Sequence, residues 1–152
     1  MQPIQALLSP LKPATGSVQD LVLQFGIDES RVSKKPQGAV KAYGANTHRG
    51  IFRNYNEDRV SIITNFGQDR NLLFAAVYDG HGGDVCADYL KDNLHVHLSG
   101  QLSQTKNMEE ALSKSIYVAE YNVLRNSELR SEFSGSCALM AVVSGTAYCE
   151  CR

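Results

Sequence analysis

The sequence contains no tryptophan, and its four prolines all lie within the first 36 residues. Neither sign of charge dominates, because 15 Lys and Arg stand against 16 Asp and Glu and the formal net charge is −1. This balance differs from the basic composition of nucleic-acid-binding proteins, so we expect no nucleic-acid partner. No apolar run approaches the roughly 18 residues of a membrane-spanning helix, so we expect no membrane partner either.

Cysteines are also few, at positions 86, 137, 149 and 151, and their spacing is not that of a disulfide framework. The first residues lack the cationic segment of a secretory signal, and no Asn-x-Ser/Thr sequon is present. We therefore expect reduced thiols and a cytoplasmic or nuclear protein rather than a secreted one.

What the sequence does contain is typical of one globular domain: 152 residues, 43% hydrophobic and 20% charged. Residues 1–38 differ in composition and are interpreted as a flexible N-terminal extension, with the domain at 39–152. Within the extension, residues 17–26 have the capping and apolar spacing of a short amphipathic helix. Packing of this helix on the domain is the simpler interpretation, and docking to a partner is the alternative.

The apolar periodicity of the remaining chain predicts strands, then two helices, then a hairpin. The order βββααββ indicates an α/β (α+β) fold of layers, with helices stacked on a largely antiparallel sheet. The expected strands cover residues 41–47, 58–64, 72–78, 137–143 and 146–151, with turns over 65–71 and at Ser144-Gly145. The first expected helix runs from Val85 to Gly100, and the second follows a cap at Asn107 and continues to Val123.

Two chemically dense stretches, 53–58 and 79–83, flank one predicted hairpin. A turn centred on Gln68 would place Glu57 opposite Asp79 and would bring Asp58 near Tyr78. Three carboxylates would then crowd one end of the hairpin, and such like charges favour a neutralising cation. Carboxylate oxygens suit Mg²⁺ or Mn²⁺.

Two residue-level points qualify this metal hypothesis. Neighbouring residues of a regular strand point to opposite faces, so Glu57 and Asp58 reach one site only at an irregular strand end or through water. Gly80 would let the backbone leave the strand sharply and offer its carbonyl as a further ligand. An ordinary strand-to-helix turn is the alternative interpretation of residues 79–83, and a surface ion pair with Glu57 or Asp58 is the alternative for Arg53.

The same residues carry a family resemblance. Val77-Tyr78-Asp79-Gly80-His81-Gly82-Gly83, preceded by Arg53 and by Asn56-Glu57-Asp58, resembles the metal-dependent protein serine/threonine phosphatases of the protein phosphatase 2C family. Ser134-Gly135-Ser136-Cys137-Ala138 resembles the Ser-Gly-Ser-Thr-Ala segment that opens a later strand of that family. The likeness runs from about residue 42 to residue 143 and corresponds to the N-terminal half of the family's domain.

The resemblance implies a β-sandwich flanked by helices, of which residues 39–152 would form roughly the first half. It implies two Mg²⁺ or Mn²⁺ ions in the intact site. Asp79 would bridge both ions, Glu57 would bind directly, Gly80 would offer its carbonyl, and Asp58 would hold metal-bound water. With the family's later aspartates absent, we expect weak metal affinity.

The resemblance also implies hydrolysis of phosphoserine and phosphothreonine in phosphoproteins by a metal-bridged hydroxide. Arg53 would bind the substrate phosphate, and His81 would protonate the leaving oxygen. An inactive fragment that binds phosphoproteins or regulates a relative is the alternative function. A half-sandwich would leave apolar strand surface such as 72–77 partly uncovered and able to associate through strand edges.

Overall fold

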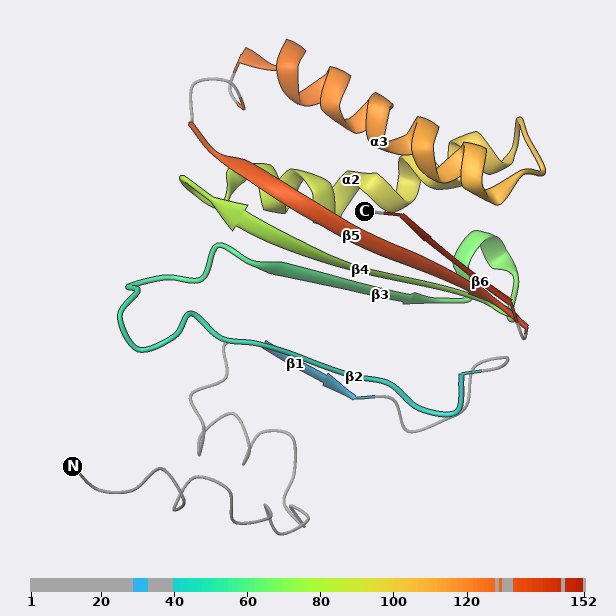
Figure 1. Cartoon of the computed structure of the whole chain (residues 1–152), viewed down its shortest axis with the longest axis horizontal. Helices are drawn as coiled ribbons and strands as arrows, with labels where there is room; N and C mark the ends of the chain where they lie inside the picture. Colours follow the sequence, from blue (N-terminus) through green and yellow to red (C-terminus); the bar gives the residue numbers. More distant parts are fainter. Residues whose placement is uncertain (1–28, 33–39, 128, 130–132, 146, 152) are drawn as a thin grey trace, which may run out of the picture.

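The computed structural model describes residues 29–32, 40–127, 129, 133–145 and 147–151 (Figure 1). The helix expected at 17–26 lies outside these residues. Two sheets and two long helices make up the described part of the chain. In chain order the elements are β1 (Glu29–Val32), β2 (Gly44–Thr47), β3 (Arg59–Thr64), the short helix η2 (Phe66–Gln68), β4 (Leu72–His81), α2 (Val85–Leu102), α3 (Met108–Arg125), β5 (Gly135–Ser144) and β6 (Ala147–Cys151).

The larger sheet is an antiparallel meander in the order β3-β4-β5-β6, and β1 pairs with β2 in a separate two-stranded sheet. Figure 1 shows α2 and α3 on one side of the meander and β1 and β2 on the other. The predicted layers and the predicted antiparallel sheet are therefore confirmed. Strand β1 was not predicted, because its sequence Glu-Ser-Arg-Val has a single apolar residue and no alternation to reveal it.

The core lies between the larger sheet and the helices. Phe74 and Tyr78 of β4 are fully buried there, together with Leu94 and Leu98 of α2. These helix positions recur at the i, i+4 spacing that places side chains on one helical face. The core therefore arises from two matching patterns, a period of two in β4 and a helical period in α2.

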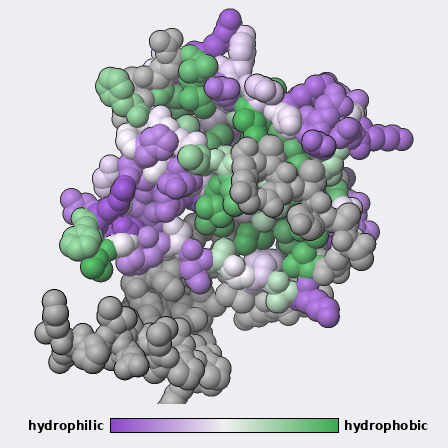
Figure 2. All heavy atoms as spheres, viewed as in Figure 1, coloured by the Kyte–Doolittle hydropathy of each residue, from purple (hydrophilic) through white to green (hydrophobic). Residues whose placement is uncertain are grey.

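The other face of β4 is less well covered. Val77 is 48% exposed and its partner across the ladder, Leu139, is 44% exposed. A hollow of about 380 Å³ separates this face from β2. In Figure 2, hydrophobic side chains gather near the centre of the viewed face, with hydrophilic ones beside them. The expectation of uncovered strand surface is confirmed at Val77, but Leu73 and Phe74 are buried.

The helices form as predicted, and each ends two residues later than predicted, α2 at Leu102 and α3 at Arg125. The Asn107 side chain accepts a hydrogen bond of 3.2 Å from the Glu110 N–H, so the predicted cap of α3 is confirmed. Helix α2 continues past Gly100 to Leu102, because an exposed glycine two residues from the end weakens a helix without ending it. Within the described residues, no helix has the length and apolarity needed to cross a membrane.

The second hairpin is also confirmed, with its turn shifted by one residue. Ser144 still pairs with Ala147, so the turn lies after Ser144 rather than on it. Gly145, with φ of 55°, takes the left-handed conformation that such a tight turn requires.

Candidate active site

The register of the β3–β4 hairpin decides which residues meet at its open end. Arg59 pairs with Tyr78, and Thr64 pairs with Leu73, in one continuous ladder. Extended by two residues, this register places Asp58 opposite Asp79 and Glu57 opposite Gly80. The predicted pairing of Glu57 with Asp79 is therefore wrong by one residue.

The turn explains the shift. Asn65, Gly67 and Gln68 all have positive φ, and a short 3₁₀ helix occupies residues 66–68. The centre of the hairpin consequently falls between Gln68 and Asp69 rather than on Gln68. A shift of one residue changes which face of the sheet each side chain occupies, so Asp58 shares a face with Asp79 and Glu57 does not.

Gly80 lies in close contact with the Glu57 backbone. A Cβ atom at Gly80 would be 2.2 Å from the Glu57 carbonyl oxygen and 3.2 Å from the Ala87 Cβ. Gly80 itself stays in β4 and pairs with Ser136, so the predicted exit from the strand at Gly80 is wrong. The backbone turns at Gly82 and Gly83 instead, where φ is 68° and 124°.

The Glu57 carboxylate links the two chemically dense stretches, 53–58 and 79–83. Its residue is only 7% exposed, and Oε1 accepts a hydrogen bond of 2.7 Å from the Gly83 N–H. Oε2 accepts a hydrogen bond and ion pair from the Arg53 guanidinium. The carboxylate thus lies just before the first turn of α2, where the helix dipole favours an anion. The ion pair that was the alternative interpretation of Arg53 is present in this structure.

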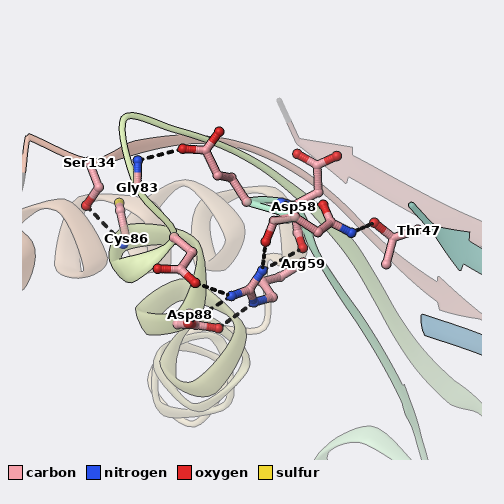
Figure 3. A network of polar contacts seen from close by, with 10 residues as sticks. Thr47, Asp58, Arg59, Gly83, Cys86, Asp88 and Ser134 are labelled. Atoms are coloured by element: carbon pink, nitrogen blue, oxygen red, sulfur yellow. Dashed lines mark hydrogen bonds and ion pairs between the residues drawn. The ribbon is translucent and has the colours of Figure 1, made fainter. Parts of the chain in front are cut away.

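Arg59 is a site residue that the sequence analysis missed. Its guanidinium forms ion pairs with Asp84 and Asp88 at the start of α2 and donates to the carbonyl oxygens of Asn56 and Asp58 (Figure 3). An arginine at the head of the apolar strand Arg-Val-Ser-Ile-Ile-Thr was a usable signal, since a partly buried cation needs partners. The partners themselves lie 25 and 29 residues away and are not visible in the sequence.

His81 ends β4 and is held against β5. It pairs with Gly135, and a Cβ atom at Gly135 would lie 2.5 Å from its Nε2 atom. The imidazole therefore lies directly over Gly135, in the segment that opens β5. The preceding residue, Ser134, accepts a hydrogen bond of 3.2 Å from the Cys86 N–H of α2 (Figure 3).

The predicted cation ligands are only partly brought together. Among the described residues, no group of three or more His, Cys, Asp or Glu side chains converges in a way that could hold a metal ion. Extension of the register offers two carboxylates, Asp58 opposite Asp79, and the backbone carbonyl of the next residue, Gly80. All three are hard oxygen donors, and Mg²⁺ accepts one or two carboxylates while keeping several waters. This donor set fits one hydrated divalent ion and does not by itself assemble a two-ion centre.

Comparison with known proteins identifies relatives over most of the described residues. The model of the family described as protein phosphatase 2C matches residues 42–149. A probable protein phosphatase 2C of Arabidopsis thaliana is 32% identical over 91 residues, which is 58% of this chain and 23% of that protein. A probable protein phosphatase of Drosophila melanogaster is 46% identical over 66 residues, which is 43% of this chain and 9% of that protein.

A solved structure supports the fold. The structure described as a sex-determining protein of C. elegans superposes with a TM-score of 0.54 at 21% identity, covering 76% of this chain and 27% of that one. The chain spans about a quarter of the length of the first relatives it matches. With the family model covering most of the sequence, the chain belongs to the protein phosphatase 2C family.

Proposed function

We propose that this chain carries the phosphate-binding and part of the cation-binding residues of a protein serine/threonine phosphatase that uses Mg²⁺ or Mn²⁺. One observation carries the proposal: Arg53, three acidic residues (Glu57, Asp58 and Asp79) and His81 all lie at or just beyond the open end of the β3–β4 hairpin. The Arg53–Glu57–Gly83 contacts and the register of Asp58 with Asp79 support it.

Arg53 is the residue that binds the phosphate of the substrate. Its side chain is 67% exposed, and its planar fork of N–H donors matches two phosphate oxygens. In the absence of substrate, the Arg53 guanidinium forms an ion pair with Glu57, so it is already oriented when a phosphoprotein binds.

His81 donates a proton to the serine or threonine oxygen that leaves phosphorus. An alkoxide is a poor leaving group, and a positioned acid of suitable pKa speeds its departure. Gly135 has no side chain, and this leaves room for the imidazole at the end of β4.

Asp58, Asp79 and the Gly80 carbonyl would hold a divalent ion at the same end of the hairpin. When bound, Mg²⁺ or Mn²⁺ activates water as the nucleophile and offsets charge on the phosphoryl group. Glu57, bonded to Arg53 and Gly83, orients the guanidinium rather than filling the coordination sphere.

Hydrolysis of a phosphothreonine peptide by the purified chain tests this proposal. With millimolar Mn²⁺ we expect phosphate release that disappears on addition of EDTA and in the Asp79→Asn variant. Asp69→Asn, in the exposed turn at the other end of the hairpin, is the matched control and should behave as the wild type. Equal phosphate release by the wild type and Asp79→Asn would refute the proposal.

A second function, phosphoprotein binding without turnover, is favoured by the incomplete ligand set among the described residues. In that case the wild type would bind a phosphothreonine peptide in EDTA, Arg53→Ala would not, and neither would release phosphate. Fluorescence anisotropy of a labelled peptide, with its unphosphorylated form as control, separates this function from the first.

A further inference from the structure

We infer that Arg59 is a positioning residue that fixes the turn carrying Glu57 and Asp58 against the first turn of α2, and so sets the geometry of the candidate cation site. The inference rests on the proposed function, because it concerns the same end of the β3–β4 hairpin.

All five N–H groups of the Arg59 guanidinium have acceptors. Nε donates to Asp88 Oδ1 at 2.5 Å, and Nη2 donates to Asp88 Oδ2 at 3.0 Å and to Asp84 Oδ2 at 2.9 Å. Nη1 donates to the Asn56 carbonyl at 2.7 Å and to the Asp58 carbonyl at 3.0 Å. One planar group therefore links two segments, and Figure 3 shows it lying between them.

Of the two segments that Arg59 links, residues 56–58 contain Glu57, and the start of α2 follows the Gly83 N–H that binds the Glu57 carboxylate. Asn56 and Asp58, whose carbonyls Arg59 holds, are the two neighbours of Glu57. Asp84 directly follows Gly83, whose N–H binds the Glu57 carboxylate. Arg59 thus sets the separation between the backbone that bears Glu57 and the backbone that binds it.

The environment of Arg59 makes this link rigid. The side chain is 16% exposed, whereas its partners Asp84 and Asp88 are 43% and 49% exposed. Asp84 occupies the N-cap position of α2 but makes no side-chain capping bond there, and its carboxylate contacts Arg59 instead.

A second tether holds the other side of the turn. The Asn56 side chain donates to Thr47 Oγ1 of β2 at 2.7 Å, and its Oδ1 accepts from the Asp58 N–H at 3.0 Å. These bonds orient Asn56 but do not reach α2. Loss of Arg59 would therefore leave the turn tied to the start of α2 through the Glu57–Gly83 hydrogen bond, and to β2 through Asn56.

The test compares Mn²⁺ binding and hydrogen exchange in the wild type and three variants of the full chain. Asp88→Asn and Arg59→Lys weaken the link without replacing a candidate ligand. Asp92→Asn, one turn further along α2 and exposed, removes the same charge and serves as the matched control. Loss of the free Mn²⁺ signal in electron paramagnetic resonance measures binding, and circular dichroism verifies folding.

We expect Arg59→Lys to weaken Mn²⁺ binding about tenfold, as for residues that orient metal ligands elsewhere. Asp88→Asn should weaken Mn²⁺ binding several-fold more than Asp92→Asn. Both variants remove one negative charge from α2, but only Asp88→Asn also removes a partner of Arg59. Amide exchange should accelerate in peptides covering residues 53–60 and 82–88 of the two link variants, while peptides of α3 stay unchanged.

Two outcomes would overturn the inference in distinguishable ways. A wild-type chain that binds no Mn²⁺ would refute the proposed cation site, and the positioning role with it. A wild type that binds Mn²⁺ equally with all three variants would leave the cation site standing and would remove the positioning role alone.

Discussion

Replacement of Gly80 by alanine gives a direct measure of how closely the hairpin end is packed. The new Cβ atom would lie 2.2 Å from the Glu57 carbonyl oxygen and 3.0 Å from its carbonyl carbon. Ordinary contact begins at 3.4 Å, so the Glu57 backbone must move by about 1.2 Å to make room. Ala87 closes the other side, at 3.2 Å from the new atom.

The structure allows the free energy of this change to be bracketed. Overpacking of a well-packed position destabilises a protein by roughly 1–3 kcal/mol. Alanine offsets part of this, because it restricts the unfolded chain by about 0.4–1 kcal/mol relative to glycine. We therefore expect Gly80→Ala to lower the free energy of unfolding by about 1–2 kcal/mol.

Gly135→Ala is the matched control, because it makes the same change on the neighbouring strand. There the new Cβ atom would meet the His81 ring, at 2.5 Å from Nε2, and an exposed side chain can rotate away. The main effect of Gly135→Ala is then the restriction of the unfolded chain by alanine. The free energy of unfolding should change by no more than about 0.5 kcal/mol, within the range of surface substitutions.

Urea unfolding followed by circular dichroism measures both variants. With a slope of about 2 kcal/mol/M, typical of small proteins, Gly80→Ala should lower the unfolding midpoint by roughly 0.5–1 M. If its midpoint matched that of the wild type, the close approach of Glu57 to Gly80 would be wrong. If Gly80→Ala and Gly135→Ala lowered the midpoint equally, a backbone neighbour such as Glu57 would be no harder to displace than a side-chain neighbour such as His81, which would refute this prediction.

Three further changes test other parts of the molecule. Asn107→Ala removes the cap on the Glu110 N–H and should destabilise the chain by about 1 kcal/mol in urea unfolding; an unchanged midpoint would contradict the cap. Leu94→Ala opens a cavity at a fully buried position and should cost about 3 kcal/mol, with less than 1 kcal/mol as the refuting value. Burial raises the pKa of Tyr78 from 10.0 to about 12, so the neutral phenol is favoured in the folded state. The stability that the neutral Tyr78 phenol contributes is fully present below pH 10 and is lost as the pH rises from 10 to 12. The free energy of unfolding of Tyr78→Phe should therefore fall less over this pH range than that of the wild type.

Much of the fold was predictable because its signals are local. The cap at Asn107 and the apolar spacing of α2 act within one or two helical turns, and both are present in the structure. The two hairpins follow from β-strand patterns separated by turn residues. Clustering of Arg53, Glu57 and Gly83 at one end of a hairpin also follows, since a hairpin brings its two outer ends together.

The pairing register of β3 with β4 at the open end of the hairpin could not be predicted from local patterns. It depends on the number of residues in the turn, and that number reflects the left-handed conformations of Asn65 and Gln68. Neither residue is glycine, so composition alone does not reveal them. Because of this difference of one residue, the extended register sets Asp58, and not Glu57, opposite Asp79.

The sequence by itself determined the helices and the two hairpins. It also determined which residues are available for phosphate and cation chemistry and that a hairpin brings them close together. Only the tertiary structure decided that Glu57 binds Gly83, and that Arg59 links the turn at Asn56 to Asp84 and Asp88. Local patterns encode contacts over a few residues, whereas these bonds span up to 29 residues and form only when α2 packs beside β3.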